Sequence, residues 1–73
     1  SLDALRLSWS LLSDRHKSSL KTLEPRYVSA DGGTYQLIAG PLPNDAEAVK
    51  ICATLRTRGV SCRPAEFKGD GLQ

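Results

Sequence analysis

The sequence predicts a small α+β domain in which helices cover one face of an antiparallel sheet. Three observations lead to this fold class. A helical pattern opens the chain, a hairpin pattern follows it, and a strand, a helix and a second extended segment occupy residues 34–67. With 73 residues, 40% of them hydrophobic and 25% charged, the composition is that of one globular domain with a thin stability margin.

The first sixteen residues fit two patterns. Apolar residues alternate with polar ones, as in a half-buried strand, at Leu5, Leu7, Trp9 and Leu11. A second set recurs at spacings of three and four, as in an amphipathic helix, at Leu2, Leu5, Trp9, Leu12 and His16. We predict a helix, because the helical pattern continues toward Leu20 and Ser1 is placed to cap it. The approach to Pro25 predicts a break before Leu23.

A hairpin is expected next. Residues 26–30 form a short strand candidate, and Asp31-Gly32-Gly33 offers the positive φ angles of a tight turn. Pro25 fits the first position of an edge strand, where its missing amide costs nothing. Residues 34–39, rich in β-branched and aromatic side chains, complete an antiparallel pair that ends at Gly40-Pro41.

The remaining residues predict a helix and a last strand. Asn44 can cap the helix while Glu47, three residues later, reaches back to it, and Gly59 suits the left-handed residue that ends it. Residues 60–67 resume an extended pattern. The order is helix, strand, strand, helix, strand, which is a ferredoxin-like βαββαβ unit without its first strand.

This pattern resembles the second half of SPOR (sporulation-related repeat) domains. The resemblance is carried by residues 35–42 (YQLIAGPL), by the acidic, alanine-rich helix start at 45–48, and by the glycine-led segment 59–62. The paired Cys52 and Cys62 are similar to a proteobacterial envelope subset, as are the helix and the residues after it at Trp9, Leu12, His16, Leu20, Leu23, Pro25 and Arg26.

The resemblance implies a non-catalytic module that binds peptidoglycan glycan strands, in the periplasm or cell envelope, within a membrane-anchored protein of cell division. It implies no cofactor. SPOR domains also open with a strand in the middle of the sheet, which nothing before Ser1 supplies. We therefore expect residues 1–73 to be a single domain truncated at its N-terminus, with self-association through the exposed strand edges.

The two cysteines suggest a bridge. Cys52 shares a helix face with Ala48 and Leu55, and Cys62 lies a few residues into the returning strand. At ~1.5 Å per helical residue and ~3.3 Å per strand residue the two lie level on either side of Gly59. A disulfide is geometrically plausible, and two buried free thiols are the alternative. A bridge would indicate an oxidising compartment.

The expected binding face follows from strand alternation. Tyr35, Leu37 and Ala39 suit the face covered by helices, so the side chains left for the open face are those of Thr34, Gln36 and Ile38, with Arg63 beside them on the last strand. These four residues are the predicted glycan-binding set. Hydroxyl, amide, guanidinium and aliphatic groups together suit a sugar chain, and their use resembles that of the open sheet face in SPOR domains.

Other functions have weaker support. His16 is expected to be a packed, hydrogen-bonded core histidine, no Ser-His-acid set can be assembled, and two cysteines with one histidine are too few ligands for a metal site. The net charge of +2 is small and the basic residues are scattered, which argues against nucleic acid. An RNA-binding module of the same topology is the second reading, and a structural dimerisation unit is the third.

Overall fold

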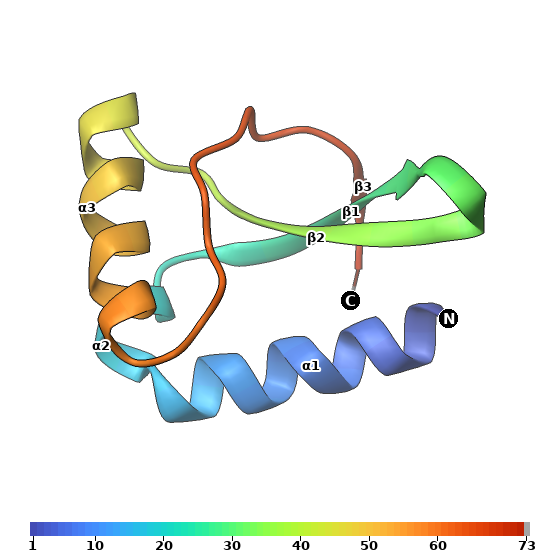
Figure 1. Ribbon diagram of the computed structural model, residues 1–73, viewed down its shortest axis with the longest axis horizontal. Coiled ribbons are helices and arrows are strands. Elements are labelled where there is room, and N and C mark those ends of the chain that lie inside the picture. Colours follow the sequence, from blue (N-terminus) through green and yellow to red (C-terminus); the bar gives the residue numbers. More distant parts are fainter. Residues whose placement is uncertain (73) are drawn as a thin grey trace.

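A computed structural model gives the structure of residues 1–72 (Figure 1). Its elements are α1 (Leu2–Arg15), α2 (Lys17–Leu20), β1 (Glu24–Ala30), the 3-10 turn η1 (Asp31–Gly33), β2 (Thr34–Gly40), α3 (Asp45–Thr57) and β3 (Asp70–Gly71). The α1 helix runs along one side of the β1–β2 hairpin, and α3 stands at the end of the hairpin where β2 finishes (Figure 1). The predicted α+β class, with helices and an antiparallel sheet, is confirmed.

The helical reading of the first residues is correct. The Ser1 hydroxyl accepts a hydrogen bond from the Ala4 amide at 3.2 Å and so caps α1. The helix breaks at His16, whose φ of −126° and ψ of 46° are not helical, and α2 then adds a single turn. The predicted break therefore falls before Leu23, as expected.

The signals around the hairpin and α3 are also confirmed. Gly32 and Gly33 have φ angles of 76° and 77°, and the turn places Ala30 opposite Thr34. The Asn44 side chain accepts from the Glu47 amide at 3.0 Å, although residues 1–72 contain no return bond from the Glu47 carboxylate. Gly59, at φ 83°, ends α3 in a Schellman turn, in which the Val60 amide donates to the Leu55 carbonyl at 3.0 Å.

The predicted last strand is wrong. Residues 60–67 form no ladder, and the strand that closes the sheet is β3, which pairs with β1 through Arg26 opposite Gly71 and Tyr27 opposite Asp70. The sheet order is β2-β1-β3. One local cause opposes a strand at 60–67, because Pro64 has no amide to donate to a ladder.

The edge position predicted for Pro25 is also wrong. Its strand, β1, lies between β2 and β3, and Pro25 is buried. The ladder with β3 begins only at Arg26, so the missing amide of Pro25 interrupts no bond to β3. Its carbonyl accepts from the Leu72 amide at 3.2 Å, and the Leu72 side chain is fully buried.

One apolar cluster joins all the helices to one face of the sheet. Its buried members are Trp9, Leu20, Leu55 and Leu72. Tyr27 of β1 and Leu37 and Ala39 of β2 pack against them. This cluster sets the inner face of the hairpin, and the residues between these three on each strand point the other way.

Candidate functional site

The open face of the hairpin carries the predicted set from β2. Leu37 and Ala39 face the core, so strand alternation directs Thr34, Gln36 and Ile38 to the opposite face. Tyr35 is 38% exposed because it lies near the hairpin turn, where its ring meets the Tyr27 ring edge-on with centroids 5.6 Å apart. Placing Tyr35 under the helices was therefore only partly right.

The structure brings three of the four predicted side chains together. Gln36, Ile38 and Arg63 line one cavity of about 650 Å³ between β2 and residues 60–65. Thr34 lies outside it, and its hydroxyl donates to the Asp31 carbonyl at 3.0 Å within the turn. The cavity has a mixed lining, since Trp9 and Leu55 of the core also border it.

Strand β1 adds residues to this face that the alternation along residues 34–39 did not predict. The register places Arg26 opposite Ile38, Val28 opposite Gln36, and Ala30 opposite Thr34. Side chains directly opposite each other on an antiparallel pair share a face. The three-residue turn at 31–33 fixes this register, so the sequence held the signal that would have found them.

Phe67 was also missed, because it falls in the segment predicted as a strand. Its ring covers Gly40, where an added Cβ would lie 2.8 Å from the ring. The Arg26 guanidinium carbon lies 4.0 Å from the centroid of the same ring, at the distance of a cation–π contact. Phe67 thus covers part of the open face. Its neighbours Ala65, Glu66 and Lys68 border a second hollow of about 620 Å³, shared with Val28, Gln36 and Ile38.

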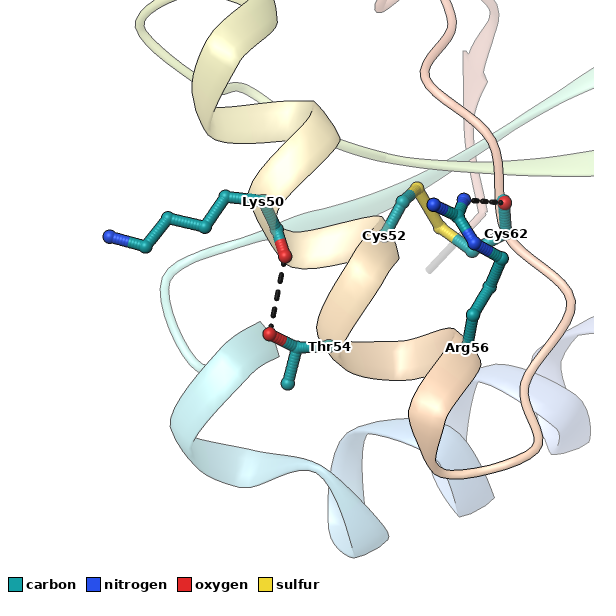
Figure 2. Close-up of a disulfide and its surroundings, with 5 residues drawn as sticks. All are labelled: Lys50, Cys52, Thr54, Arg56 and Cys62. Carbon is teal, nitrogen blue, oxygen red and sulfur yellow. Dashed lines mark hydrogen bonds between the residues drawn. A yellow bond between two sulfur atoms is a disulfide. The ribbon is translucent and has the colours of Figure 1, made fainter.

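A disulfide fixes the start of this segment. Cys52 of α3 and Cys62 are bridged with an S–S distance of 2.08 Å and Cα atoms 5.2 Å apart, which confirms the predicted pairing (Figure 2). The Arg56 Nη1 atom donates to the Cys62 carbonyl at 2.8 Å, beside the bridge (Figure 2). Two ties from α3 therefore hold residue 62 and bring its neighbour Arg63 to the cavity.

His16 is packed, as predicted, with 9% of its surface exposed. The expected hydrogen bond is missing, because its buried Nδ1 has no partner among residues 1–72. The residue lines neither hollow. Within the described chain, no three His, Cys, Asp or Glu side chains gather as metal ligands, and no helix has the length and apolarity to cross a bilayer.

Comparison with known families gives this arrangement a context. The sequence model of the SPOR domain matches residues 10–62, which include β1, β2, α3 and both cysteines of the disulfide. The chain belongs to the SPOR domain family. SPOR domains are generally peptidoglycan-binding modules of cell-division proteins, and they are binding domains and not catalytic ones.

The matched residues of this SPOR domain contain Gln36 and Ile38, whereas Arg63 and Phe67 follow the match. Searches of curated proteins and of solved structures found no match. We therefore infer the roles of individual side chains in this SPOR domain from its own geometry.

Proposed function

We propose that this SPOR domain binds the glycan strands of peptidoglycan through Gln36, Ile38 and Arg63, without catalysing a reaction. One observation carries the proposal: these three side chains, from β2 and from the segment after α3, line one cavity between β2 and residues 60–65. Thr34 shares the face but lies outside the cavity, and we assign it a smaller role at the periphery.

The chemistry of the three groups matches that of an amino-sugar chain. The Gln36 amide both donates and accepts, so it can pair with a hydroxyl or an acetamide, while the Arg63 guanidinium offers several donors. The Ile38 side chain is half-buried and supplies an aliphatic surface for the apolar face of a sugar ring. Gln36 is the polar residue of the set that borders both hollows, a position that it shares with Ile38.

The disulfide supports a location in the periplasm or cell envelope. Disulfides form and persist in oxidising compartments and are rare in the cytosol. The Cys52–Cys62 bridge joins a helix to the segment that carries Arg63, so it is part of the framework of the proposed site. A parent protein of cell division, anchored in the membrane, would hold such a domain beside the cell wall.

Co-sedimentation with peptidoglycan tests the proposal. The chain should pellet with purified sacculi, and pelleting should increase after an amidase has removed the stem peptides and left bare glycan. The double variant Gln36→Ala/Arg63→Ala should bind about 5- to 150-fold less tightly, because two hydrogen-bonding groups worth roughly 0.5–1.5 kcal/mol each are lost.

Lys50→Ala is the matched control for charge. Lys50 is exposed on α3, and its side chain points away from the disulfide and from residue 62 (Figure 2). This variant removes one positive charge, as Arg63→Ala does, and should pellet like the unmodified chain. If the double variant pellets as well as the Lys50→Ala control, the proposed site is wrong.

Single-stranded RNA serves as the competing ligand in the same experiment. RNA-binding modules of this topology stack bases on aromatic side chains of their central strands. The open face of β1 and β2 presents Arg26, Val28, Gln36 and Ile38 instead. We expect no retention of RNA at moderate salt, and retention that exceeds glycan binding would favour the RNA-binding reading.

A further inference from the structure

One arginine of the open face is held in place by a ring. Arg26 lies directly opposite Ile38 in the hairpin register, so the two side chains share the open face. The guanidinium carbon of Arg26 lies 4.0 Å from the centroid of the Phe67 ring, and 35% of the Arg26 side chain is exposed. The ring therefore restricts a partly exposed cation beside Ile38, a residue of the proposed glycan site.

The donors of this cation have no acceptor in the described chain. Arg6 and Arg56 donate hydrogen bonds to main-chain carbonyls, whereas Arg26 donates none within residues 1–72. Arg26 forms an ion pair with Glu24, but its Nη2 atom and the Glu24 Oε1 atom are 3.6 Å apart, which is too long for a hydrogen bond. The N–H groups of a planar fork are thus open to an acceptor from outside the chain. A carboxylate matches this fork, because its two oxygens can accept two parallel hydrogen bonds.

The other cations near this face are less restricted. Arg63 and Lys68 are exposed, and neither takes part in an ion pair or a cation–π contact within residues 1–72. A flexible side chain loses conformational entropy when a ligand fixes it, and this loss is smaller for a side chain that is already restricted. Arg26 is therefore the cation of the open face best prepared for a directed contact with an anion.

A glycan strand of peptidoglycan offers a carboxylate in only one of its forms. When a stem peptide is present, the acidic group of the muramic sugar is joined to it as an amide. Hydrolysis of that amide leaves a carboxylate on the sugar and an amino group on the released peptide. The sugar thereby gains a negative charge and loses an N–H donor, which is the change that a free guanidinium can detect.

We infer that Arg26 binds this sugar carboxylate, so that the charge of the group, and not only the absence of the peptide, decides the affinity. The inference rests on the proposed glycan function and adds to it one residue and one ligand group. Glu24 opposes the contact, because its carboxylate lies near the same guanidinium and repels a second negative charge. Substitutions of Arg26 and Glu24 should therefore have opposite effects.

Binding of two forms of one glycan fragment tests the inference on the full chain. Both forms come from amidase-treated peptidoglycan, and in one of them methylamine is coupled to the carboxylates, which removes their charge without restoring a peptide. Fluorescence anisotropy of end-labelled fragments gives the two dissociation constants. We expect the charged fragment to bind at least about tenfold more tightly at low salt, as for a hydrogen bond between charged groups. The difference should become smaller at high salt.

Substitutions assign this difference to one side chain. Arg26→Ala should bind the two fragments within about twofold of each other, and Arg26→Lys should keep part of the difference, because lysine has the charge and lacks the fork. Glu24→Gln should increase the difference by about two- to fivefold, since it removes the competing carboxylate. Lys50→Ala, at an exposed position of α3, is the charge control and should behave like the unmodified chain. The urea midpoint of each variant, followed by Trp9 fluorescence, checks that the variant is folded.

Two results would overturn the inference and leave glycan binding intact. The first is equal binding of the charged and amidated fragments by the unmodified chain. The second is an unchanged difference in Arg26→Ala, and a loss of the difference in Arg63→Ala would then assign the carboxylate to Arg63. Failure of the unmodified chain to bind either fragment would refute the proposed glycan function, and this inference with it.

Discussion

Removing the disulfide should lower the free energy of unfolding by about 2.5–3 kcal/mol. The change is the double variant Cys52→Ala/Cys62→Ala. The two cysteines are separated by 10 positions, and the loop-closure relation gives about 2.7 kcal/mol for a loop of that length. A domain of 73 residues is expected to have a total stability of only about 4–11 kcal/mol, so this loss is a large share.

Urea unfolding followed by Trp9 fluorescence measures the effect. For a chain of this size the dependence on urea is about 1 kcal/mol per molar, so the midpoint should fall by about 2.5–3 M. A reductant that reaches the bridge should move the unmodified chain toward the midpoint of the variant. The variant itself should not respond to reductant.

Arg56→Ala provides the matched control. It removes the exposed hydrogen bond to the Cys62 carbonyl, which is the other tie between α3 and residue 62, and leaves the bridge intact. Its midpoint should shift by about 0.5–1.5 M, as for one hydrogen bond. If the double cysteine variant shifts no more than Arg56→Ala, the bridge contributes little to the stability of this chain and the loop-closure reasoning is refuted.

Three further substitutions test the path of the last residues. Gly69→Ala should cost at least about 2 kcal/mol, because its φ is 103° and an added Cβ would collide with a carbonyl of β1. Gly40→Ala should cost about 1–3 kcal/mol by displacing the Phe67 ring. Leu72→Ala should cost about 2–5 kcal/mol, since that side chain is fully buried. Gly71→Ala, where an added Cβ meets nothing within 4 Å, is the control for all three in urea unfolding. Gly40→Ala or Gly69→Ala as stable as Gly71→Ala would mean that residues 65–71 follow another path.

The positions of the proposed site residues were predicted in part. Alternation along residues 34–39 placed Gln36 and Ile38 on the open face, because the apolar partners of that strand are recognisable from the sequence. Arg63 lies at the cavity for a different reason than the predicted one, since its segment is not a strand and the disulfide holds the neighbouring residue. The position of Phe67 was not predicted, because its contact with Gly40 joins residues that are far apart in the sequence.

The sequence by itself determined the local elements and their ends. The caps at Ser1 and Asn44, the glycines of the hairpin turn and the left-handed Gly59 each act within a few residues, so their patterns are legible without a fold. The cysteine pairing could also be predicted from the sequence, because only a short stretch of chain separates the two residues.

Only the tertiary structure decided which edge the last residues join. An extended pattern indicates that a segment can pair with a strand, but it does not indicate which strand that is. Pro64 weakens pairing near β2, Gly69 permits a close approach to β1, and the burial of Leu72 adds an apolar contact at the end of that path. Together these features favour β3 beside β1. The contacts of Gly69 and Leu72 with β1 join residues far apart in the sequence, so the sequence pattern alone did not predict this pairing.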